Sequence, residues 1–307
     1  MTDTLSEGQP TRLKLKAIGI YFVLVLLVSG GLSGGLFMLL HQLGVEDLDF
    51  GGFSFRILQF TAMLGSIVLL SVLGQRGWSA IGLSQNPRFK HELVQGLLFG
   101  LISLSLICGA LLILDLRVIR PDLITEPGHW VEVVVRAALA AVVIAVIEEA
   151  WFRGALHNIF SSVLRVSTSI VLIALFYALM HFLRPDASGL QEQPVELWSG
   201  YQALYDGLIN IPLLGMQDSI VALFIVGLLL GILRERHGNI AMCIGVHMGW
   251  VFVIKVHKKF TYINPKADLN MLVGQYDGVL GWLAAGLLLL MTLIIWLPGW
   301  LPRSKSA

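Results

Sequence analysis

Long apolar runs separated by short polar connectors set the pattern of this 307-residue chain. A helix that crosses a bilayer needs roughly 20 mainly apolar residues. Runs of that kind predict about eight transmembrane helices, at residues 17–40, 57–73, 93–114, 133–155, 163–182, 220–233, 240–256 and 279–297. The predicted fold class is therefore all-α, in a polytopic membrane protein.

The connectors define a simple predicted organisation. Residues 1–16 form a polar N-terminal segment, 17–300 a multi-span membrane domain and 301–307 a C-terminal tail. The first apolar run is too long for the apolar core of a cleavable signal peptide, so it is interpreted as a first span. The longest connector, 183–217, contains Trp198, Tyr201 and Tyr205, whose aromatic rings suit a helix or structured loop at the membrane interface.

Composition excludes several classes of protein. Charged residues make up 13% of the chain, against about 25% in soluble globular proteins, and the net charge of +1 offers no basic field for nucleic acid. Cys108 and Cys243 lie alone in separate apolar runs, which argues against a disulfide framework or a thiolate zinc site. Both are expected to be buried packing residues.

The distribution of basic residues predicts the orientation. With the N-terminus in the cytoplasm, twelve of the 21 Lys and Arg residues fall on the cytoplasmic side and nine on the other. Three basic residues precede the first span and favour the same orientation. We expect a multi-pass protein of the inner (plasma) membrane with both termini in the cytoplasm.

Ionisable residues inside apolar runs are the candidates for chemistry, because such groups are costly in a bilayer and usually functional. Glu148, Glu149 and Arg153 lie in the sequence VIEEAWFRGAL at the end of the fourth run. His181 ends the sequence FYALMH in the fifth run, and His247 lies in CIGVHMGW in the seventh.

Helical spacing separates the two adjacent acids. Glu149 and Arg153 are four residues apart and can pair on one helix face, whereas Glu148 lies about 100° around the helix and can face a neighbouring helix. This division predicts one structural and one chemical carboxylate. The alternative is that both acids and the arginine only hold helices together.

Two histidines on separate spans extend this candidate site. With a carboxylate they could activate a water molecule and stabilise an oxyanion, which peptide hydrolysis requires. They could instead hold a zinc ion through nitrogen and oxygen ligands.

At these residues the chain resembles the CPBP (CAAX protease and bacteriocin-processing, Abi) family of intramembrane endopeptidases. The order of motifs is two glutamates with an arginine four residues after the second, an aromatic residue four before a histidine, and a histidine on a later helix. The sequence RERHGNIAMCIGVHMGW resembles the family's third-motif region, and the resemblance covers about residues 133–256. Two positions depart from the family pattern: Tyr177 replaces the usual phenylalanine, and Val251 replaces a frequent asparagine or aspartate.

The resemblance implies roles for individual residues. Glu148 would activate water, Glu149 would be braced by Arg153, and His181 and His247 would position water and stabilise the oxyanion. Substrate contacts would come from Tyr177 and Trp250. A zinc held by Glu148, His181 and His247 is the alternative, but no HExxH sequence is present, so a cofactor-free glutamate mechanism is favoured.

The expected function is hydrolysis of a peptide bond in a membrane-associated or lipidated protein or peptide. Two other hypotheses stay open. A catalytically silent scaffold or immunity factor is favoured by Val251, whose side chain offers no hydrogen bond. A proton-coupled transporter would show inverted repeats, which the sequence does not display.

Overall fold

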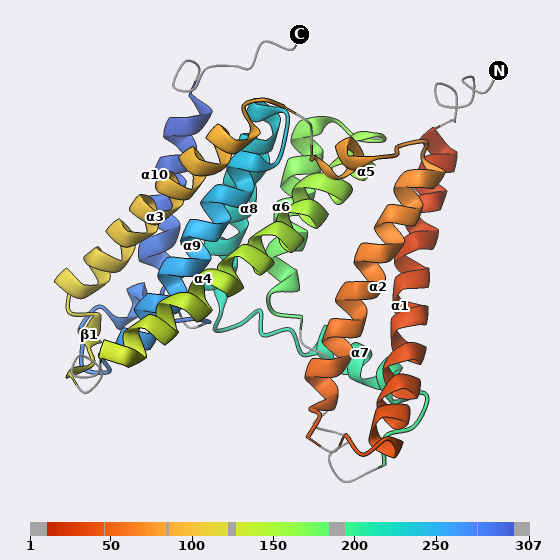
Figure 1. The fold of residues 1–307 in the computed structure, drawn as a ribbon, viewed down its shortest axis with the longest axis horizontal. Coiled ribbons are helices and arrows are strands. Elements are labelled where there is room, and N and C mark those ends of the chain that lie inside the picture. Colours follow the sequence, from red (N-terminus) through yellow and green to blue (C-terminus); the bar gives the residue numbers. More distant parts are fainter. Residues whose placement is uncertain are drawn as a thin grey trace. The chain divides into compact units, whose positions relative to one another are not determined.

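The computed structural model describes residues 11–45, 47–83, 86–121, 127–183, 194–274 and 276–297, and the chain forms two compact units (Figure 1). The first unit consists of Met1–Arg76, Asn158–Arg165 and Leu179–Pro212, and the second consists of Gly77–His157, Val166–Ala178 and Leu213–Ala307. The predicted terminal segments lie largely outside the described residues, which begin at 11 and end at 297.

The first unit is built on three helices: α1 (Thr11–Gln42), α2 (Phe50–Val72) and α7 (Ser199–Ile209). Glycines of α1 permit a close approach of α7, because a Cβ atom on Gly30 would meet the ring of Tyr201 and one on Gly34 would meet backbone at Leu197. The Tyr201 hydroxyl donates to the carbonyl of Leu27 over 2.9 Å. The glycines of the first apolar run are therefore packing positions.

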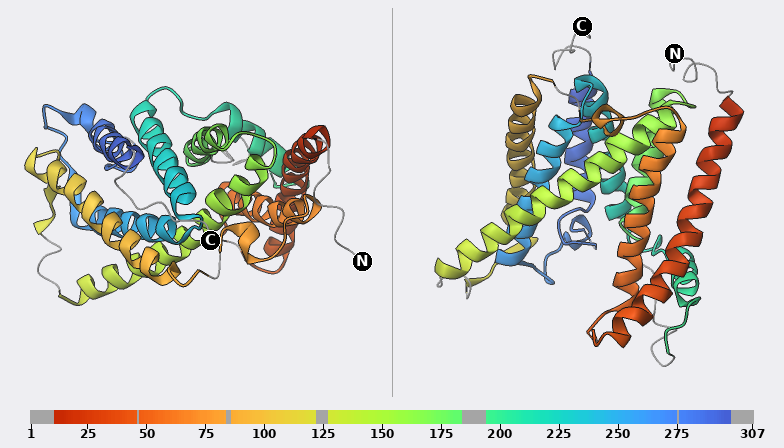
Figure 2. Two further views of the ribbon diagram at one scale, coloured as in Figure 1. Left: turned by 90° about the horizontal axis from the view of Figure 1, so that it is seen from above. Right: turned by 45° about the vertical axis from the view of Figure 1, so that its right-hand side comes forward.

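The second unit carries most of the predicted chemistry. Its long helices are α3 (Phe89–Ile113), α4 (Pro127–Glu149), α8 (Gln217–His237), α9 (Ala241–Phe260) and α10 (Trp282–Trp296), together with most of α6 (Val166–Met180). The 3₁₀ turn η1 (Trp78–Ile81) precedes α3, and η5 (Asn270–Leu272) precedes α10. Helix α9 packs against both α3 and α4, and α8 packs against α10, as the two views of Figure 2 also show.

A two-stranded antiparallel sheet closes one end of this unit. Strand β1 (Arg117–Ile119) follows α3, β2 (Thr261–Ile263) follows α9, and Val118 pairs with Tyr262. Buried Arg117 donates to the Thr261 hydroxyl over 2.7 Å and to the carbonyl of Gly278 over 2.9 Å. Burial lowers the pKa of Arg117 below its ordinary value. The contacts hold the ends of α3 and α9 together.

The all-α fold class is confirmed, and each predicted span corresponds to a helix. Five described helices are long and apolar enough to cross a membrane, while the predicted count of eight is not confirmed. Helices α6 and α10 contain only 15 residues each, which is about 22 Å at 1.5 Å per residue, against about 30 Å of hydrocarbon. Helix α9 carries His247, His257 and lysines that lower its mean hydropathy.

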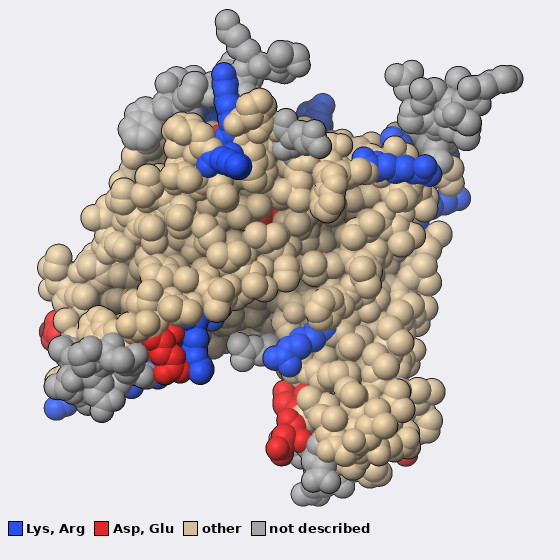
Figure 3. All heavy atoms as spheres, viewed as in Figure 1, with Lys and Arg blue, Asp and Glu red and all other residues tan. Residues whose placement is uncertain are grey.

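The surface agrees with this assignment. On the face shown in Figure 3, Lys, Arg, Asp and Glu side chains gather near the ends of the helices, and the surface between them is almost entirely uncharged. Leu139, Val143 and Val146 of α4 are among the many apolar side chains that stay exposed, as lipid-facing residues would. Cys108 and Cys243 are buried and free, as expected for packing residues.

Candidate active site

An alanine stripe on α4 determines which of the two acids is buried. Ala137, Ala141 and Ala145 recur at every fourth position and are at most 4% exposed, and Glu149 continues the same face with no exposure. Residues four apart lie above one another on a helix. Small side chains along this face let α9 approach closely, so Glu149 enters the contact between α4 and α9.

The helix changes character directly after the two acids. Helix α4 ends at Glu149, and Ala150–Leu156 forms a π-helical segment, η3, before α5 (His157–Ser161). The sequence pattern predicted one regular helix through residue 155, which is wrong over this segment. Short π segments are rare and frequently occur at functional sites. Arg153 lies in this segment and is 1% exposed.

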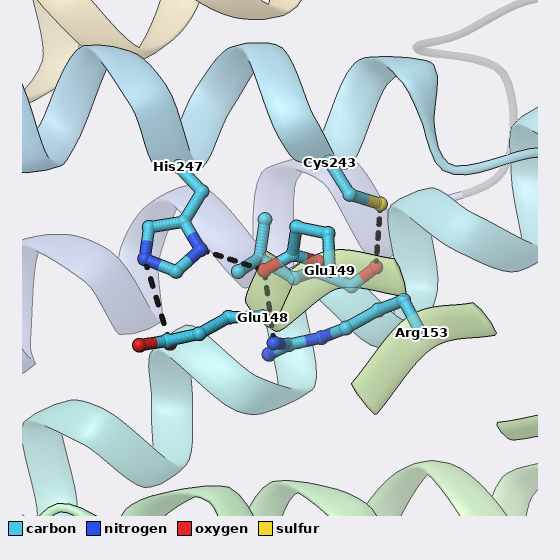
Figure 4. Close-up of polar contacts among 6 residues, drawn as sticks. Glu148, Glu149, Arg153, Cys243 and His247 are labelled. Carbon is cyan, nitrogen blue, oxygen red and sulfur yellow. Dashed lines mark hydrogen bonds and ion pairs between the residues drawn. The ribbon is translucent and has the colours of Figure 1, made fainter. Parts of the chain in front are cut away.

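Glu149 is the centre of a buried polar network, shown in Figure 4. Its Oε1 atom accepts a hydrogen bond from Arg153 Nη1 over 3.0 Å and lies 2.7 Å from Nδ1 of His247 on α9. An ionised carboxylate can only accept hydrogen bonds, so Nδ1 of His247 is the donor of this contact when Glu149 is ionised. The pairing of Glu149 with Arg153, expected from their spacing, is present, and the bond from His247 adds a second partner.

Glu148 has a different environment. Its side chain is 23% exposed, and Oε2 lies 3.8 Å from Nε2 of His247. The imidazole therefore lies between the two carboxylates, with one nitrogen on each (Figure 4). Glu148 is the more accessible acid and Glu149 the enclosed one, which is the division that helical geometry predicts.

Several polar atoms at this site have no hydrogen-bond partner among the described residues. They are Oε2 of Glu148, Oε2 of Glu149, and Nε and Nη2 of Arg153, and all four are buried. A buried polar group without a partner costs about 1–3 kcal/mol. Such a concentration of unmatched donors and acceptors is suited to hold water or a polar part of a substrate.

Tyr177 supports Arg153 from α6. Its ring is 2% exposed and lies 4.5 Å from the guanidinium carbon, and it meets Phe152 edge-on with 5.0 Å between ring centroids. A cation over an aromatic face in a desolvated site contributes on the order of 2 kcal/mol. This position favours a supporting role for Tyr177 over the predicted substrate contact.

Trp250 points from α9 towards α3. It is 4% exposed, and its indole nitrogen donates to the Ser103 hydroxyl over 2.9 Å. A contact between two packed helices favours a structural role over the predicted substrate contact. Val251 is half-buried on the same helix.

His181 follows directly after α6 and is half-buried. It belongs to the first compact unit, whereas Glu148, Glu149, Arg153 and His247 belong to the second. Its role therefore stays a prediction from the motif.

A zinc site normally needs at least three protein ligands. Within the described ranges, no three His, Cys, Asp or Glu side chains gather closely enough to hold a metal ion. Glu148, Glu149 and His247 are brought together in the second unit, whereas the third predicted ligand, His181, belongs to the first unit. The zinc alternative therefore stays a prediction, and no step is assigned to a metal.

The sequence patterns missed several residues that fix the π segment. His157 Nε2 lies 2.7 Å from Oε1 of Glu235, and Arg234 Nε donates to the carbonyl of Arg153 over 3.1 Å. Gly154 packs directly on the backbone of Ile81 in η1. Arg234 and Glu235 lie near the end of α8, and no local sequence signal predicts their partners.

The comparison with protein families bears on this arrangement. Residues 130–253 match the family model described as type II CAAX prenyl endopeptidase Rce1-like. This segment is therefore similar to the CAAX proteases. The matched residues contain Glu148, Glu149, Arg153, His181 and His247, and the family resemblance is confirmed. No curated protein and no solved structure matches the chain.

The description of the matched family, type II CAAX prenyl endopeptidase, implies a protein or peptide substrate associated with the lipid bilayer. The described residues include five helices that are long and apolar enough to cross a membrane, which agrees with that description.

Proposed function

We propose that this protein hydrolyses a peptide bond of a membrane-associated or lipidated protein, with Glu148 as general base. The observation that carries the proposal is the position of His247, which Glu149 holds by one nitrogen while the other faces Glu148. A prenylated peptide ending in a CAAX sequence is the substrate class that the family description suggests.

The proposed reaction uses His247 with a proton on each ring nitrogen, with Nδ1 facing Glu149 and Nε2 facing Glu148. Glu149 orients the imidazole, as the buried carboxylate of a catalytic triad does.

The proposed reaction follows from these positions. Glu148 accepts a proton from water while the water oxygen bonds to the substrate carbonyl carbon. The Nε2–H of His247 stabilises the resulting oxyanion. The tetrahedral intermediate then collapses, the C–N bond breaks, and Glu148 returns the proton to the leaving amine nitrogen. His181 keeps its predicted role of positioning the water.

A comparison of small membrane-associated peptides tests the proposal even though the natural substrate is not identified. Cells that contain the wild-type protein are compared by mass spectrometry with cells that contain Glu148→Gln at equal expression. We expect peptide fragments that appear only in cells with the wild-type protein. In a direct assay, the purified protein is given a farnesylated CAAX peptide with a quenched fluorophore. Identical peptide sets in both cells would favour a catalytically silent scaffold, the function consistent with Val251.

A further inference from the structure

Helices α3 and α9 pack through glycine on both sides. A Cβ atom on Gly96 would meet the carbonyl of Met242, and one on Gly100 would meet backbone at Val246. The contact is reciprocal, since Gly245 and Gly249 of α9 also lie against the backbone of α3. The two helices run in the same direction. These four glycines bring the two backbones into contact, and we call this contact the glycine seam.

Such a seam brings the helices close without fixing their register. Side chains that interlock as ridges in grooves determine the rotation and axial position of packed helices. Glycine provides no side chain for this purpose, although it allows close van der Waals contact in a membrane. The register of α9, and of His247 on it, therefore depends on other contacts. These include the apolar cluster in which Phe89 and Leu93 pack against Ile240 and Ile244, and two polar contacts.

Two polar contacts flank the four glycines, and their spacing along the sequence is the same on both sides. At one end, Asn239 Nδ2 donates to Oε2 of Glu92 over 2.7 Å, and at the other, Trp250 Nε1 donates to Oγ of Ser103 over 2.9 Å. Glu92 precedes Ser103 by eleven positions on α3, and Asn239 precedes Trp250 by the same number. Eleven residues make about three helical turns, or roughly 16 Å, so Glu92 and Ser103 lie on one face of α3. Asn239 lies two residues before the start of α9 at Ala241, and Trp250 lies within that helix.

The first contact is joined directly to the start of α9. Asn239 has no exposed surface, and its Oδ1 accepts a hydrogen bond from the backbone N–H of Ala241 over 2.8 Å. Glu92 is 6% exposed and also lies 3.3 Å from Nδ1 of His237. Asn239 therefore uses its amide to connect α3 to the first turn of α9.

His247 lies between the two contacts, eight residues after Asn239 and three before Trp250. We propose that the Glu92–Asn239 and Ser103–Trp250 hydrogen bonds set the register of α9 and so position His247 between Glu149 and Glu148. The four residues are positioning residues, and their importance for cleavage rests on the proposed function. A displacement of about 1 Å in an active site can reduce the rate by about 10²-fold.

Reversal of the first hydrogen bond tests the proposal. Asn239→Asp removes the donor and places a carboxylate against Glu92, while it keeps the acceptor for Ala241. Glu92→Gln combined with Asn239→Asp restores a donor and an acceptor with their positions exchanged. Asn239→Ser is the milder variant, because serine can still accept from Ala241 but is too short to reach Glu92. Trp250→Phe removes the donor of the second contact.

The readout that does not depend on cleavage is the imidazole of His247. In protein labelled with ¹⁵N-histidine, the short Nδ1–H bond to Glu149 gives a downfield proton signal, assigned by its loss in His247→Gln. We expect Asn239→Asp, Asn239→Ser and Trp250→Phe to shift or lose this signal, and the exchanged pair to recover it. Thermal unfolding identifies any variant that fails to fold, and Glu132→Gln and Trp296→Phe, both exposed in the same unit, are the controls.

Cleavage of the farnesylated peptide is measured on the same samples. We expect Asn239→Asp to lower the rate of cleavage about 10²-fold. The exchanged pair should cleave at least about tenfold faster than Asn239→Asp alone. An unchanged His247 signal in a folded variant that lacks either contact overturns the proposal, as does an exchanged pair no better than Asn239→Asp alone. Wild-type protein that gives the His247 signal but cleaves nothing contradicts the proposed function and leaves the test of register intact.

Discussion

Removal of Arg153 should expose how strongly the network around Glu149 depends on its cation. Arg153 and Glu149 are 1% and 0% exposed, and their 3.0 Å ion pair lies away from solvent. Removal of one partner of a buried ion pair typically costs about 3–5 kcal/mol, because the other charge is left without compensation. We expect Arg153→Gln to lower the free energy of unfolding by about 3–5 kcal/mol.

The two residues should also behave as a unit. Glu149→Gln removes the charge that Arg153 and His247 both contact, so it should destabilise the protein to a similar degree. Since each single variant leaves the same ion pair broken, Glu149→Gln with Arg153→Gln should lose less than the sum, with a coupling of about 1–3 kcal/mol. The free energies of unfolding of the two single variants and the double variant are measured in detergent, with intrinsic fluorescence as the signal.

Helix α4 provides a matched control. Glu132 and Arg136 have the same spacing of four residues and a 2.8 Å ion pair, but their side chains are 52% and 80% exposed. Glu132→Gln and Arg136→Gln should each change the free energy of unfolding by only about 0.3–0.5 kcal/mol. Additive losses for Glu149 and Arg153, or losses no larger than those of the exposed pair, would refute the buried network as the structural centre of the site.

Two further predictions concern close backbone contacts in the second unit. Gly100→Ala should destabilise the protein by about 1–3 kcal/mol, because its Cβ would meet backbone at Val246, whereas Gly109→Ala on the same helix has open space and should be neutral or slightly stabilising in thermal unfolding. Gly154→Ala would press against the backbone of Ile81 next to the π segment, so we expect a comparable loss of stability together with reduced cleavage, and wild-type behaviour in both assays would show that this contact is not required.

The sequence predicted the helices well because apolar length is a local property. Each predicted apolar run contains a helix, although the fourth run changes to a π segment at Ala150. The orientation of Glu148 relative to Glu149 followed from 3.6 residues per turn. The stripe of Ala137, Ala141 and Ala145 was also readable, since small residues every four positions identify a packed face. That stripe ends at Glu149 and would have predicted its complete burial.

Other features depend on contacts between distant segments and were not predicted. The π segment at Ala150–Leu156 depends on partners such as Glu235 and Arg234, which lie about 80 residues away. Glu92 and Asn239 lie at the ends of predicted spans, where polar residues usually face solvent or headgroups. Only the fold shows that they are buried and bonded to each other.

The glycine seam lies between these two cases. Gly96 and Gly100 are four residues apart, as are Gly245 and Gly249, and this spacing favours close helix packing. The spacing alone does not pair α3 with α9, because Gly227 and Gly231 show it too and pack on Ala174 and Ile170 of α6.

The proposed mechanism depends above all on Glu148, and cleavage by Glu148→Gln is its decisive test. Glutamine keeps the shape of the side chain but cannot accept a proton as a base. General-base catalysis contributes about 10²–10⁴-fold, so cleavage of the farnesylated peptide should fall by that factor while expression and thermal stability stay near wild type. Wild-type cleavage should also survive a strong chelator. Loss of cleavage with chelator and its recovery with zinc would contradict the glutamate mechanism, and unchanged cleavage by Glu148→Gln would contradict the assignment of the base itself.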